Sequence, residues 1–220
     1  MSIRSIYLAA PLLAALAFAP MTASAGGSPA VTTSAVHDFP DGPTKAGASS
    51  TLVRNDAGVT GTFLAPNLNP GDTYTFWWVI FNHPENCSDG VCGLDDAAPF
   101  PGNPAVGVSL VIGGGQVIGN SGDGYFGSHL APGDVSGALF GPGLLDPIAA
   151  EIHIVLRNHG QVIPELLDDQ LGSFGGGCEV NSCSNEISAT HLPLADQTSA
   201  EVSAIKALLE RVAIRQGIRP

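Results

Sequence analysis

The pattern of apolar and polar residues predicts short β-strands over most of the chain. Runs of β-forming residues occur at 51–54 and 59–64, and Asp56-Ala57-Gly58 between them is typical of a hairpin turn. The segment 73–81 gives the strongest strand signal, because its nine residues are all β-formers with no glycine or proline among them. It is apolar throughout from Phe76 onward, which predicts a strand buried on both faces.

The two adjacent tryptophans of that segment allow two interpretations. Trp77 and Trp78 could form a platform on which a ligand stacks, or they could pack in the core. We expect core packing, because the surrounding residues are those of a buried strand.

Residues 148–159 alternate in a way that predicts a strand with two different faces. One face is aliphatic, with Ile152, Ile154 and Leu156. The other face carries Glu151, His153, Val155, Arg157 and His159. Half-burial explains the alternation, but this set of polar residues also makes that face a candidate ligand or metal site.

Further strands are expected at 106–112 and 125–130. Two glycine clusters, 113–115 and 119–124, predict one or two tight hairpins between them. Neither cluster opens a convincing helix, so neither is interpreted as a phosphate-binding loop. The residues 82–103 predict a long loop, in which adjacent acids such as Asp95 and Asp96 are expected to be solvated.

The chain changes character at its C-terminal end. Thr198-Ser-Ala-Glu201 matches a capping box, and apolar residues then recur at helical spacing up to Val212. Gly217 suits the end of a helix, so we expect an amphipathic helix over about 199–216. The helix could dock on the rest of the chain, form a homodimer contact or act as a surface-binding tail.

The N-terminal end has the features of a cleaved signal peptide over residues 1–25. Arg4 supplies the positive charge, 7–18 the apolar stretch, and Ala23-Ser24-Ala25 the small-residue cleavage site. This predicts a secreted or periplasmic protein without a transmembrane anchor. The expected organisation is a flexible lead-in at 26–48, a β-sandwich domain at 49–197 and the helix and tail at 198–220.

Composition supports a β-rich fold. The 220 residues include 28 Gly and 17 Pro, which disfavours a helical bundle, and only 13% are charged, which excludes the highly charged type of disordered chain. We therefore predict a mainly β fold, an antiparallel β-sandwich with long disulfide-pinned loops and a C-terminal amphipathic helix.

The formal charge of −12 is unevenly distributed. Residues 26–200 contain three basic and 18 acidic residues, whereas residues 201–220 contain four basic and two acidic ones. Residues 26–200, which form the acidic body of the chain, are expected to repel phosphate backbones. We therefore do not expect nucleic acid as a partner.

The cysteines fall into two matched pairs, Cys87 with Cys92 and Cys178 with Cys183. In an exported chain an even number of cysteines predicts two disulfides, and the matched spacing favours these local pairs. A four-cysteine zinc site is the alternative that the spacing leaves open.

Histidines and carboxylates offer a second kind of chemistry. His153 with His129, or with His191 from a neighbouring strand, could bind Zn, Cu or Fe together with Glu151. His153 and His159 are about 20 Å apart along an extended strand, so they cannot share one ion unless the strand turns.

Two stretches carry a resemblance to known proteins. They are WWVIFNHPENC (77–87), followed by Cys92-Gly93, and LLDPIAAEIHIVLRNHG (144–160). Both look like motifs of uncharacterised exported bacterial proteins, and the similarity spans most of 50–192. The Glu-Ile-His strand also resembles those of CHRD-type and Cu/Zn superoxide dismutase sandwiches, but the close His-x-His pair of the dismutase is absent.

Two functions follow as expectations. The first is a non-catalytic binding or structural module for an unknown protein or small-molecule ligand, because few groups that could act in catalysis are expected to converge. The second is a metal-dependent extracytoplasmic enzyme, for which Glu151, His153, His129 and His159 are the candidate residues.

Overall fold

The structure is a computed structural model that describes residues 29–194. The expected signal peptide and the expected C-terminal helix lie outside the described residues. Within them, no helix is long and apolar enough to cross a membrane.

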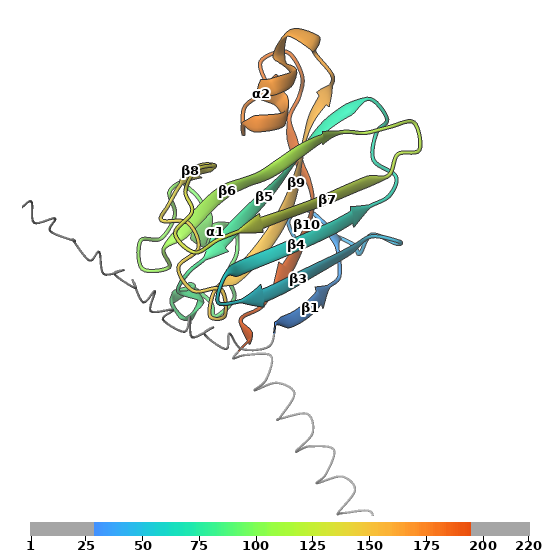
Figure 1. The fold of residues 1–220 in the computed structure, drawn as a ribbon. Coiled ribbons are helices and arrows are strands. Elements are labelled where there is room, and N and C mark those ends of the chain that lie inside the picture. The colour runs from blue at the N-terminus through green and yellow to red at the C-terminus, as the bar shows by residue number, and fades with distance from the viewer. Residues whose placement is uncertain (1–28, 195–220) are drawn as a thin grey trace, which may run out of the picture.

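Two antiparallel sheets make up the described part of the chain, which is therefore mainly β (Figure 1). The four-stranded sheet has the order β1 (Ala30–Ser34), β3 (Ser49–Asn55), β4 (Gly58–Ala65) and β7 (Gly124–Leu130). The six-stranded sheet has the order β2 (His37–Asp38), β10 (Ser184–His191), β9 (Glu151–Gln161), β5 (Asp72–Phe81), β6 (Val108–Val117) and β8 (Ala138–Phe140). Between residues 29 and 194, four short helices lie in the loops: η1 (Pro84–Asn86), α1 (Leu94–Ala97), η2 (Pro164–Leu166) and α2 (Leu167–Gly172).

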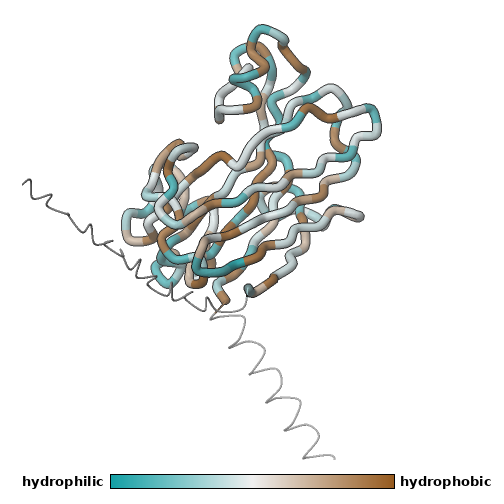
Figure 2. Tube along the Cα trace, in the orientation of Figure 1, coloured by the Kyte–Doolittle hydropathy of each residue, from teal (hydrophilic) through white to brown (hydrophobic). Residues whose placement is uncertain are grey.

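The two sheets share one hydrophobic core. Leu52 and Phe63 of the four-stranded sheet belong to the same buried cluster as Trp78 and Ile154 of the six-stranded sheet. The packing is tight at Gly61 on β4, where an added Cβ would lie 2.5 Å from the Trp78 ring. Hydrophobic positions recur along the strands of both sheets, as the pattern of period two requires (Figure 2).

The outer faces of the two sheets differ in character. On the four-stranded sheet this face is exposed and carries residues such as Thr60, Thr62 and His129. On the six-stranded sheet it carries a second buried cluster, Trp77, Leu110 and Val155. The expectation that residues 73–81 form a strand buried on both faces is therefore confirmed.

The expected flexible lead-in at 26–48 is wrong for most of its length. Ala30–Ser34 pairs with β3, and His37–Asp38 pairs with β10. The segment is ordered because it buries side chains, with Thr32 8% exposed and Val36 fully buried. The Gly, Pro and Ser content of the segment is typical of a loop, so these two edge strands were not predicted.

The expected turn at Gly113-Gly114-Gly115 is also wrong, because β6 runs through it to Val117. The pairing with β5 shifts by one residue at Gly113, which is typical of a β-bulge. An added Cβ at Gly113 would lie 2.3 Å from the Phe76 ring, and one at Gly115 would lie 2.6 Å from the Leu171 carbonyl oxygen. Glycine is needed at these positions because other groups approach the backbone closely, not because the chain turns. The turn expected at 119–124 does join β6 to β7.

Candidate functional site

A pocket of about 860 Å³ lies on the outer face of the six-stranded sheet. Its floor is made by neighbours in the strand pairing. Trp77 on β5 is opposite Val155 on β9, and Val79 lies between His153 on β9 and Leu110 on β6. The apolar strand predicted at 73–81 thus contributes Trp78 to the core and Trp77 to the pocket floor.

The walls of the pocket come from both edges of the sheet and from the loops. Phe39, Pro40 and Asp41 follow the edge strand β2, and Phe140 belongs to the opposite edge strand β8. The loop between β5 and β6 contributes residues between Asp89 and Phe100. Segments far apart in sequence therefore enclose one space.

Aromatic rings join the walls across the pocket. Phe100 contacts Phe140 at a centroid distance of 4.9 Å and Phe174 at 6.3 Å. Phe174 in turn contacts Trp77 of the floor edge-on at 5.4 Å. These rings give the pocket a largely apolar lining with several flat surfaces.

One hydrogen-bonded pair interrupts this lining. Nε2 of His153 lies 2.6 Å from Oε1 of Glu151, and the His153 ring contacts the Phe81 ring at 4.9 Å. The Glu151 side chain is only 5% exposed, whereas that of His153 is 18% exposed and lines the pocket. Nδ1 of His153 has no hydrogen-bond partner among residues 29–194.

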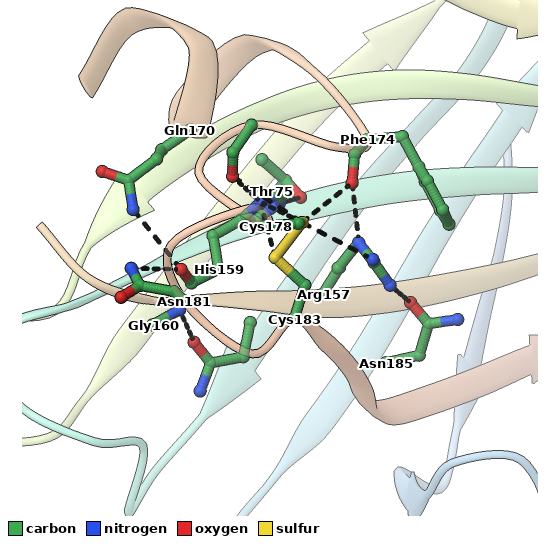
Figure 3. The surroundings of a disulfide bond; sticks show 12 residues. Thr75, Arg157, His159, Gly160, Gln170, Phe174, Cys178, Asn181, Cys183 and Asn185 are labelled. Atoms are coloured by element: carbon green, nitrogen blue, oxygen red, sulfur yellow. Dashed lines mark hydrogen bonds between the residues drawn. A yellow bond between two sulfur atoms is a disulfide. The ribbon is translucent and has the colours of Figure 1, made fainter. Parts of the chain in front are cut away.

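The predicted polar face of β9 thus divides into two functions. His153, which is bonded to Glu151, lines the pocket. Arg157 and His159 instead hold the loop that carries the wall residue Phe174 (Figure 3). Nε of Arg157 donates to the Phe174 carbonyl oxygen at 2.8 Å, and its guanidinium lies 4.1 Å from the Phe174 ring centroid. Nη1 of Arg157 donates to Oδ1 of Asn185 at 3.0 Å.

His159 is fully buried and has a hydrogen-bond partner on each side of its ring. Nδ1 lies 2.8 Å from the Gly176 carbonyl oxygen, and Nε2 lies 2.8 Å from the hydroxyl of Thr75. Burial lowers the pKa of His159, so the ring is neutral, donates from Nδ1 and accepts at Nε2. The Thr75 hydroxyl also accepts from the indole N–H of Trp77, which connects the loop at 173–183 to the pocket floor.

Both expected local disulfides are confirmed, Cys87–Cys92 and Cys178–Cys183. Each pins a loop that contributes to the pocket. The first loop is also held by Asp96, which is 1% exposed rather than solvated as expected. Its carboxylate accepts from the backbone N–H groups of Ser88 and Gly93.

Of the expected metal ligands, only Glu151 and His153 lie together in the described part of the chain. His129 lies on the exposed outer face of the four-stranded sheet, bonded to Thr60, whereas His153 lies on the outer face of the other sheet. His191 is buried between the sheets, bonded to Thr32 and Ser50. His159 does lie near Cys178 and Cys183, with the donor atoms within 4.8 Å of one another, but those sulfurs form a disulfide and offer no thiolate.

Arg54 is a buried charge that the sequence did not single out. It is 0% exposed and donates to four carbonyl oxygens, those of Pro147, Ala150, His191 and Leu192. Burial lowers its pKa to about 10, an effect opposed by the nearby Glu151 carboxylate. Arg54 thereby fixes the entry to β9 and the end of β10, next to the Glu151–His153 pair.

Comparison with known proteins gives no relative. No family model, no curated protein and no solved structure matches the chain.

Proposed function

We propose that this chain is an exported β-sandwich protein whose pocket on the six-stranded sheet binds a small, largely apolar molecule. The observation that carries the proposal is the pocket itself, about 860 Å³ with an aromatic and aliphatic lining. Pockets for small molecules measure ~300–1,000 Å³ and are lined in this way, with a few polar groups placed among apolar ones.

The contrast between the two outer faces supports a binding role. A sheet that only needs to close a core can leave its other face polar, as the four-stranded sheet does with Thr60 and Thr62. The six-stranded sheet instead places Trp77, Leu110 and Val155 on its outer face beneath loops. Those loops leave a space next to the rings rather than filling it.

Several features support the sandwich and the export. The cluster shared by Leu52, Phe63, Trp78 and Ile154 brings the two sheets face to face, as in a sandwich. The two disulfides fit folding in an oxidising compartment, in agreement with the signal-like residues 1–25.

A fluorescent probe tests the proposal directly. N-phenyl-1-naphthylamine is neutral, apolar and of suitable size, and its emission rises when it leaves water. We expect saturable binding to the mature chain. The substitution Val79→Trp, which fills the pocket floor, should abolish binding, whereas Thr62→Trp on the exposed face of β4 should not. Equal binding by both variants would place the probe elsewhere and refute the proposal.

The Glu151–His153 pair favours one alternative, a metal-dependent enzyme acting in the same pocket. A carboxylate and an imidazole 2.6 Å apart are two of the donors that Zn, Cu or Fe accepts. Elemental analysis of the purified mature chain separates the two functions. A stoichiometric metal that is lost in Glu151→Gln would favour the enzyme over the binding module.

A further inference from the structure

We infer that the pocket selects molecules that present a hydrogen-bond donor to His153, such as an alcohol or an amine, and rejects carboxylates of the same shape. The inference rests on the proposed function, because it specifies the ligand class of the same pocket. It follows from the orientation of the imidazole, the state of its polar neighbours and the charge of the rim.

Glu151 determines which nitrogen of His153 carries the hydrogen. An ionised carboxylate can only accept, so in its neutral form the His153 imidazole donates from Nε2 to Oε1 across the 2.6 Å contact. Nδ1 then keeps its lone pair and is a hydrogen-bond acceptor. No described residue donates to Nδ1, and the His153 side chain lines the pocket with 18% of its surface exposed, so we assign this nitrogen to a donor group on the ligand.

Two polar groups among the lining residues are already engaged. The hydroxyl of Ser188 donates to the Pro40 carbonyl oxygen at 3.1 Å, and Oδ1 of Asn185 accepts from Arg157. A ligand that buries a hydrogen-bond donor in the pocket can therefore bond this donor to Nδ1 of His153. A ligand without a donor would leave Nδ1 unpaired and would gain only from apolar contact.

The charge around the pocket also favours a ligand that donates a hydrogen bond over a carboxylate. Asp41, Asp89 and Asp95 line it and are exposed, and no Lys or Arg is among the described lining residues. Arg157 lies behind the Phe174 ring and is engaged by Phe174 and Asn185. A carboxylate ligand would face both these acids and the acceptor Nδ1, whereas an ammonium group would be attracted.

Four molecules with one shape test the inference by calorimetry at about pH 8, above the ordinary pKa of histidine. They are 2-methylnaphthalene, 2-naphthylmethanol, 2-naphthylmethylamine and 2-naphthoate. We expect the alcohol and the amine to bind ~3–10-fold more tightly than the hydrocarbon, which corresponds to one net hydrogen bond. We expect the naphthoate to bind at least about tenfold more weakly than the alcohol.

The variant His153→Phe identifies the group responsible. It keeps an aromatic ring beside Phe81 and removes Nδ1, so the alcohol should lose its advantage while the hydrocarbon still binds. Equal affinity of alcohol, hydrocarbon and naphthoate for the unmodified chain would overturn the inference and leave the proposed function intact. Failure of all four molecules to bind would instead overturn the proposed function, and the inference with it. If the variant does not fold, the affinities of the unmodified chain still decide.

Discussion

At the scale of single residues, the interior between the two sheets holds ionisable side chains that water does not reach. His191 is 1% exposed, with its ring nitrogens 3.1 Å from the Thr32 hydroxyl and 2.8 Å from the Ser50 hydroxyl. Burial lowers its pKa to about 4, and the neighbouring positive charge of Arg54 acts in the same direction. The folded chain therefore holds His191 neutral at a pH where an unfolded chain would protonate it.

This difference makes stability depend on pH. Below the ordinary histidine pKa of ~6.5 the unfolded state binds a proton that the folded state refuses, so the free energy of unfolding falls as the pH decreases from about 6.5 to about 4. The loss from His191 is up to ~3 kcal/mol. Buried His159, whose pKa is also lowered, adds to it in the same direction.

The variant His191→Gln should flatten this dependence, because glutamine can bond Thr32 and Ser50 without titrating. Urea unfolding at a series of pH values measures it. His129→Gln is the matched control, since His129 is exposed on β7. A slope between pH 4 and 6.5 that is the same in His191→Gln as in the unmodified chain would show that another group is responsible.

At the scale of elements, Gly61 on β4 packs directly against Trp78 on β5, which is one point of close contact between the two sheets. Gly61→Ala would place a Cβ 2.5 Å from the Trp78 ring, which is fully buried and cannot move away freely. We expect a loss of ~1–3 kcal/mol in unfolding free energy. Gly127→Ala on neighbouring β7 is the control, because its added Cβ would have no neighbour closer than 3.8 Å. Equal stability of the two variants would contradict the face-to-face packing of the sheets.

The loop between β5 and β6 is expected to matter more for binding than for folding. The Cys87–Cys92 disulfide spans only five positions, so its removal should cost no more than ~2 kcal/mol of stability. The same loop carries Phe100, which joins the pocket walls. The double variant Cys87→Ser/Cys92→Ser should therefore stay folded and bind N-phenyl-1-naphthylamine much more weakly. Unchanged probe affinity would show that the loop does not shape the site.

The elements that could be predicted from sequence are those whose signal is local. The strand at 73–81 and the alternation at 148–159 follow from side-chain periodicity alone. They correspond to β5 (Asp72–Phe81) and to β9, which begins later, at Glu151. The turn predicted from the glycines at 113–115 was wrong. Glycine is needed there because Phe76 and Leu171, which are distant in sequence, approach the backbone closely. A close approach between distant segments leaves no periodic pattern.

The candidate site was predictable only in part, for the same reason. Glu151, His153, Arg157 and His159 could be assigned to one face, because alternation along a strand is local. That Phe39, Phe140 and Phe174 enclose a pocket over this face depends on which strands lie at the sheet edges and on how the loops fold back. The shared metal site of His129 and His153 was wrong because they belong to different sheets.

At the scale of the whole molecule, the acidic body and the basic C-terminal segment are expected to act together. The described chain ends at Leu194, three residues after His191, which pairs with Ile152 beside the pocket residue His153. The sequence beyond it combines four basic residues with a helical apolar pattern. We propose that this segment docks on the acidic body or on a second copy of the chain.

Truncation tests this proposal. A chain of residues 26–197 should differ from a chain of residues 26–220 in sedimentation coefficient, if the segment forms a dimer, or in unfolding free energy, if the segment docks on the body of its own chain. Sedimentation velocity and urea unfolding measure the two quantities. If both were unchanged, neither role of the segment would stand.

The central claim, that the outer face of the six-stranded sheet receives a ligand, can be tested within one spectrum. Trp77 lines the pocket, whereas its neighbour Trp78 is fully buried in the core between the sheets, and these are the two tryptophans of the chain. Their indole N–H groups give two signals in a ¹⁵N correlation spectrum, which Trp77→Phe assigns. On titration with 2-naphthylmethanol we predict a saturable shift of the Trp77 signal and little change for Trp78. A shift confined to Trp78, or no shift in either signal at saturating concentration, would contradict the account.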